Sequence, residues 1–197
     1  MDRKPWEVHP ALAGDRLCSI ASIISDVRRR TLELYDPNNG DGVWSLGCRI
    51  YERTVNTIDR EKGKLPWLNT IRDGLYFVLL VEGVPIRFYR GDVENPNTRS
   101  LRRKFLELEA QQCTFSFYEP EWFWRLVVET DDDGKILRTT LLQYTEAGDS
   151  QNLWIIPSTE HVVVETVSAE TPSETVVLEK PRVKLKQEKA VEVSQNE

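Results

Sequence analysis

The stretch 74–90, GLYFVLLVEGVPIRFYR, holds the clearest fold signal in the sequence. Residues 74–81 are a continuous apolar run of strand length, and residues 84–90 alternate apolar with polar side chains. Glu82-Gly83 between them is a tight-turn signal, so the stretch predicts a β-hairpin. Pro85 interrupts the hydrogen-bonding ladder of the second strand, which indicates a sheet edge or a bulge.

Downstream of this hairpin, the sequence predicts one helix and three more strands. Residues 92–97 carry turn signals, and Thr98 can cap a helix over 98–112. Strands are expected over 122–130, 136–144 and 153–156. The first two are separated by DDDGK, whose Asp-Gly pair between alternating runs is a strong hairpin signal.

Upstream of the hairpin, apolar residues recur every three to four positions. This period predicts helices over 11–35 and 43–62, separated by the turn-forming run 36–42. The second helix places a set of apolar residues on one side: Trp44, Cys48, Tyr51, Val55 and Ile58. The two helices therefore predict an αα-hairpin with an amphipathic face on each arm.

These elements together predict an α+β domain. The expected architecture is an N-terminal αα-hairpin followed by a mainly antiparallel sheet in the order β-β-α-β-β-β, with helices on one face. Residues 1–157 are expected to form this single globular domain. Residues 158–197 contain 8 acidic and 5 basic side chains and no aromatic ones, which predicts an acidic tail that is disordered or donates a strand to a sheet edge.

Composition excludes several protein classes. The 197 residues carry a net charge of −6, which opposes strong nonspecific binding to duplex nucleic acid. No apolar run approaches the ~18–20 residues of a membrane-spanning helix, and the N-terminus has no secretory signal pattern. Three widely spaced cysteines without such a signal predict a cytoplasmic protein whose thiols are buried as small apolar side chains.

No coherent catalytic set is present, so the sequence favours a protein that is not an enzyme and needs no cofactor. Neither His9 nor His161 lies in a recognisable nucleophile context, and the cysteines lack the paired spacing of a zinc site. A metal-dependent nuclease stays open as a minor alternative, because the order of elements can host one. The carboxylates Glu82, Glu129 and 131–133 fall in turns or at strand ends, which does not fit such a site.

One arginine-rich face is the candidate binding site. Its residues are Arg87, Tyr89, Arg90, Asp92, Arg99, Arg102 and Arg103. The arginines can bind phosphate, with Tyr89 as a stacking platform, and this would make the protein a nucleic-acid-associated regulator. The alternative is a half-buried strand with a solvated arginine face and a local ion pair.

The aromatic residues Trp122, Phe123 and Trp124 predict core packing, or an interface anchor if they are exposed. With no catalytic set, the leading hypothesis is an adaptor that binds a protein partner through its surface. Nucleic acid remains the second possible partner, and no membrane partner is expected.

Overall fold

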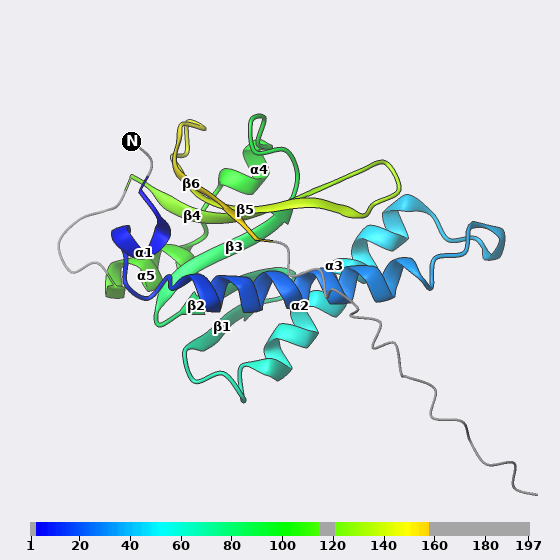
Figure 1. Ribbon diagram of the computed structural model, residues 1–197, viewed down its shortest axis with the longest axis horizontal. Helices are drawn as coiled ribbons and strands as arrows, with labels where there is room; N and C mark the ends of the chain where they lie inside the picture. Colours follow the sequence, from blue (N-terminus) through cyan, green and yellow to red (C-terminus); the bar gives the residue numbers. More distant parts are fainter. Residues whose placement is uncertain (1–2, 115–120, 158–197) are drawn as a thin grey trace, which may run out of the picture. The chain divides into compact units, whose positions relative to one another are not determined.

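The computed structural model describes residues 3–114 and 121–157, and within them the α+β class is confirmed (Figure 1). The helical elements are α1 Pro5–Val8, α2 Gly14–Leu32, η1 Pro37–Asn39, α3 Val43–Glu61, α4 Thr98–Leu101 and α5 Phe105–Thr114. The strands are β1 Leu68–Asp73, β2 Tyr76–Val81, β3 Val84–Arg90, β4 Phe123–Thr130, β5 Ile136–Tyr144 and β6 Ser150–Ile156. The expected tail, 158–197, lies outside the described residues.

The six strands form one sheet in sequence order, β1 to β6. All neighbours are antiparallel except β3 and β4, which pair in parallel because α4 and α5 connect them. Glu82 and Gly83 both have positive φ, so the predicted turn between β2 and β3 has the backbone of the tight hairpin class. The sheet thus consists of two three-stranded meanders joined by one helical crossover.

The main core lies between the sheet and the αα-hairpin of α2 and α3, as expected. It includes Leu17, Ile20 and Ile24 of α2 packed against strand residues such as Leu126. In Figure 1 both helices cross one face of the sheet, and the turn between them lies beyond the sheet. The start of α3 therefore has no strand beneath it.

A second core lies on the opposite face, under α4 and α5. Its members include Leu101, Phe123, Val127 and Leu142. Strand β4 is buried over six consecutive residues because it supplies side chains to both cores. The expectation of helices on one face holds for α2 and α3, whereas α4 and α5 cover the other face.

Two local features differ from the sequence prediction. Strand β1 was not anticipated, because LNTIRD is short and polar and gains its order from pairing with β2. The helix expected over 98–112 is divided into α4 and α5, since Arg102 is extended at φ −64° and ψ 131°. The carbonyl of Arg102 accepts a hydrogen bond from Arg87, and the amide of Lys104 donates to the Tyr76 hydroxyl, so tertiary contacts replace helical ones there.

Among the described residues, no helix has the length and apolar character needed to span a membrane.

Candidate functional site

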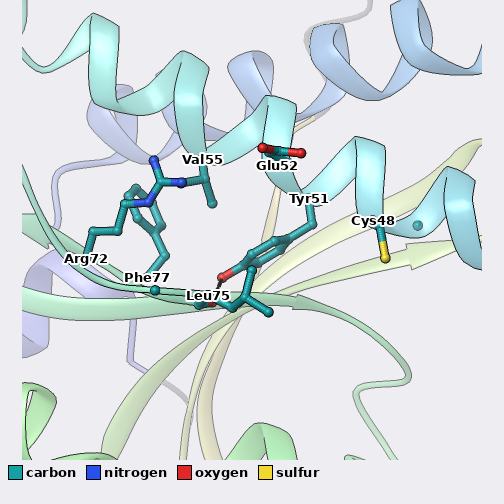
Figure 2. Close-up of a pocket in the computed structure, with 9 residues that line it drawn as sticks. Cys48, Tyr51, Glu52, Val55, Arg72, Leu75 and Phe77 are labelled. Atoms are coloured by element: carbon teal, nitrogen blue, oxygen red, sulfur yellow. Dashed lines mark hydrogen bonds between the residues drawn. The ribbon is translucent and has the colours of Figure 1, made fainter.

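A hollow of about 340 Å³ opens between α3 and the turn that joins β1 to β2 (Figure 2). Its lining is Gly47, Cys48, Tyr51, Glu52, Val55, Arg72, Gly74, Leu75 and Phe77. We call this hollow the α3 groove. Val55 and Phe77 are buried members of the main core, so the floor of the groove is fixed by the core itself.

Two contacts hold the walls of the groove in place. The Tyr51 hydroxyl of α3 donates a hydrogen bond of 2.6 Å to the Leu75 carbonyl, and its ring stacks on Phe88 at 5.6 Å. Gly74 has φ +57°, a conformation that favours glycine and allows the tight turn on which Leu75 sits. Burial raises the pKa of Tyr51, so this hydroxyl remains a hydrogen-bond donor at neutral pH.

Three large apolar side chains, one in the lining of the α3 groove and two in the first turn of α3, are exposed. Leu75 is 87% exposed, Trp44 is 82% exposed and Val43 is 69% exposed. The sequence pattern placed Trp44 and Tyr51 on one apolar side of the helix, but only the part of α3 above the sheet can bury that side. An apolar surface therefore extends from the groove along α3 toward its first turn.

The sequence predicts buried thiols, whereas two of the cysteines are at least partly exposed. Cys48 is exposed and lines the α3 groove, while Cys18 is half-buried, and both are free thiols. Cys113 lies in α5, but its side chain falls outside the described part of the chain.

The arginine-rich face predicted from the sequence is divided by strand alternation. Arg87 and Tyr89 project from β3 toward α4 and α5, and Tyr89 packs against the second core. Arg90 lies on the other face of β3, together with Ile86 and Phe88 of the main core. Desolvation lowers the pKa of the buried Arg28, and the positive charge of Arg90 lowers it further. The structure thus brings Arg87 and Tyr89 together and places Arg90 elsewhere.

Arg87 and Arg103 are both engaged in interactions within the fold. Arg87 donates a 2.7 Å hydrogen bond to the Arg102 carbonyl, and its guanidinium lies 4.5 Å from the centre of the Tyr76 ring. Arg103 forms an ion pair of 3.2 Å with Glu146 and lies 4.9 Å from the centre of the Phe123 ring. These contacts fix the crossover segment against the sheet.

The remaining predicted residues lie at the periphery of this face. Arg99 in α4 and Arg102 after it are exposed. Asp92 is also exposed and accepts a hydrogen bond of 2.8 Å from the amide of Glu94, which closes a local turn. The Tyr89 ring is half-buried. Burial raises the pKa of Tyr89, and the neighbouring Tyr144 raises it further. Tyr89 is therefore packed in a way that does not present an open stacking platform.

A buried charged network, not anticipated from the sequence, lies beneath this face. Arg125 of β4 and Glu107 of α5 are both fully buried and joined by a 2.5 Å ion pair. The Tyr76 hydroxyl donates a 2.5 Å hydrogen bond to the other Glu107 oxygen. Desolvation and this hydrogen bond raise the pKa of Tyr76 to about 12. An arginine inside the apolar strand WFWRLVV was the signal that could have revealed the network.

The carboxylates considered for a nuclease are used in local structure. Glu82 forms a 2.7 Å ion pair with Arg16, and Glu129 pairs with Arg138. Asp131 accepts a 2.7 Å hydrogen bond from the Lys135 amide within the hairpin turn. Among the side chains that the structure describes, no group of three His, Cys, Asp or Glu residues is placed to hold a metal ion.

The histidines fall in different parts of the chain. Burial lowers the pKa of His9 and outweighs the opposite effect of Glu82. His161 is outside the region that the structure covers.

Comparison with known proteins gives no relative from which a function can be transferred: no family model, curated protein or solved structure matches this chain.

Proposed function

We propose that this protein is a noncatalytic binding protein that engages a protein partner through the α3 groove and the apolar surface beside it. The observation that carries this proposal is the exposure of two large apolar side chains. Leu75 lines the hollow and is 87% exposed, and Trp44 is 82% exposed about one helical turn before the lining residue Cys48. Exposed apolar patches of this kind mark interaction surfaces, and tryptophan is enriched among residues that dominate binding energy.

The form of the α3 groove favours a protein partner over a small molecule. Small-molecule sites enclose most of the ligand and converge several polar groups on it. Here the apolar surface continues out of the hollow onto α3, and the charged groups Arg72 and Glu52 stand at its border, as in Figure 2. An apolar floor with a polar rim is the general plan of a protein interface.

The energy available at this surface is sufficient for a specific complex. A tryptophan side chain has about 150–250 Å² to bury, which at ~25 cal/mol per Å² corresponds to about 4–6 kcal/mol. A fully buried leucine adds about 1.5–3 kcal/mol. Association costs offset part of this gain, so we expect Trp44 and Leu75 to act as the main anchors.

The free thiols of Cys18 and Cys48 support placing this function in the reducing cytoplasm. Such a compartment preserves an exposed thiol like that of Cys48 in reduced form.

The exposed Cys48 provides a direct test. Cys18 and Cys113 are changed to serine, a photo-crosslinker is attached to Cys48, and adducts formed in extracts of the source cells are identified by mass spectrometry. In the matched control the crosslinker is moved to β6 by Cys48→Ser with Ile155→Cys, because Ile155 is 50% exposed and β6 is the opposite edge of the sheet from β1. We expect one defined adduct from Cys48 that the control does not form.

The same adduct must depend on the apolar anchor. Leu75→Glu places a charge at the groove and should abolish the adduct, whereas Ile155→Glu on β6 should leave it unchanged. Adducts that are the same from both label positions, or that persist in Leu75→Glu, would contradict the proposal.

A further inference from the structure

A second surface, on the opposite face of the sheet, concentrates positive charge. The crossover segment between α4 and α5 carries Arg102, Arg103 and Lys104, and it lies against Arg87 of β3. Arg125 is buried beneath it. We call this region the crossover patch, and define it by the half-buried Arg87 and the exposed Arg99, Arg102, Lys104 and Phe105.

The charges of this region are not balanced by the carboxylates around them. Arg125 and Arg87 share Glu107, at 2.5 Å and 4.0 Å, and Arg103 is paired with Glu146 at 3.2 Å. Among the residues that the structure describes, Arg99, Arg102 and Lys104 form no ion pair with a carboxylate. Three cationic side chains are therefore left without a carboxylate partner there, in a chain whose overall charge is −6.

The buried network fixes the position of two cations of the crossover patch. The Arg87 guanidinium and the Lys104 ammonium each lie 4.5 Å from the centre of the Tyr76 ring, so they are separated by no more than twice that distance. Tyr76 is held by its hydrogen bonds with Glu107 and with the Lys104 amide. The cations are thus held close together in advance, which lowers the entropic cost of binding an anion.

An exposed aromatic ring adjoins these charges. Phe105, the first residue of α5, is 75% exposed and directly follows Lys104 in the chain. Alternating cationic and aromatic groups are the arrangement that binds single-stranded nucleic acid, in which cations contact phosphates and a ring stacks on a base. Duplex binding would instead require a broader basic surface than this chain offers.

We propose that the crossover patch binds the phosphodiester backbone of single-stranded nucleic acid, with Arg99, Arg102 and Lys104 contacting phosphates and Phe105 stacking on a base. Arg87 positions this segment through its hydrogen bond to the Arg102 carbonyl. Compared with the face expected from the sequence, the patch omits Tyr89, Arg90, Asp92 and Arg103 and adds Lys104 and Phe105. It is separate from the α3 groove, so this binding and the proposed protein interface can succeed or fail independently.

The test is fluorescence anisotropy of a labelled 20-nucleotide oligo-dT titrated with the full-length chain at two salt concentrations. Arg102→Ala/Lys104→Ala should weaken binding about tenfold. The slope of log K against log salt concentration should also become shallower by about 1.4, since each lost phosphate contact contributes about 0.7 to that slope for single strands. Both side chains are exposed, so the double variant is expected to fold.

The matched control is Arg29→Ala/Arg30→Ala, which removes two exposed arginines from the end of α2 and changes the net charge equally. Its affinity should stay within about twofold of the wild type. Phe105→Ala should lose about fivefold or more in affinity, and Phe105→Tyr should retain binding because it keeps a ring.

Three outcomes would overturn the proposal. The first is absence of oligo-dT binding by the wild-type chain. The second is an equal loss in the two double variants, which would show that only overall charge matters. The third is binding to vesicles containing phosphatidylglycerol, or to inorganic pyrophosphate, at concentrations that leave oligo-dT free.

Discussion

Neutralising Glu107 tests the role of the buried network in stability. Glu107→Gln keeps the shape of the side chain but removes its charge, and it leaves the Arg125 guanidinium charged in a site with no exposure to solvent. Removing one partner of a buried ion pair typically costs about 3–5 kcal/mol. Arg125 still donates to the carbonyls of Ser100 at 2.8 Å and Trp124 at 2.9 Å. We therefore expect Glu107→Gln to lower the free energy of unfolding by about 3 kcal/mol, which is near the lower end of that range.

The assay is urea-induced unfolding of the full-length chain at pH 7, followed by tryptophan fluorescence. A loss of this size should also lower Tm by about 10 °C for a protein of this length. Glu146→Gln is the matched control, because it breaks an ion pair with Arg103 in which the Glu146 side chain is 62% exposed. That variant should lose no more than about 1 kcal/mol.

A double variant separates the charge effect from packing. Glu107→Gln/Arg125→Met removes both charges, so its loss should be smaller than the sum of the two single losses. A stabilising role for the buried ion pair is ruled out if Glu107→Gln costs no more than Glu146→Gln, or if the losses of the two single variants simply add.

Two further predictions concern the core and the response to alkaline pH. Trp124 is 3% exposed in the main core, so Trp124→Ala should lose about 3–5 kcal/mol in urea unfolding. Trp44→Ala at the exposed start of α3 should lose less than about 1 kcal/mol, and equal losses would contradict the assignment of Trp124 to the core. Because the pKa of Tyr76 is raised from 10.0 to about 12, the native state keeps a proton that the unfolded state releases. This contribution to stability is complete below pH 10 and is lost as the pH rises toward 12. Unfolding measured at pH 9 and pH 11.5 should show a smaller alkaline loss for Tyr76→Phe than for the wild type, and an identical loss would count against the shift.

The sequence alone was sufficient for the elements that local patterning controls. The helical period before residue 36, the Glu82-Gly83 turn and the Asp-Gly hairpin each depend on side chains within a few positions of one another, and each was predicted correctly. Strand β1 and the break at Arg102 were not predicted, because both depend on distant partners, β2 in one case and Arg87 with Tyr76 in the other.

The candidate sites show the same division between local and tertiary information. Backbone periodicity separates Arg87 from Arg90 on one strand, although the predicted arginine-rich face included both, and it places Trp44 on the same helix side as Tyr51. Which of these side chains are buried depends on how distant segments pack together. The turn between α2 and α3 lies beyond the sheet, which leaves Trp44 exposed, and the parallel pairing of β3 with β4 places Arg87 opposite Arg125 beneath the crossover. Burial depends on which distant segment covers a residue, and a local pattern carries no information about that segment.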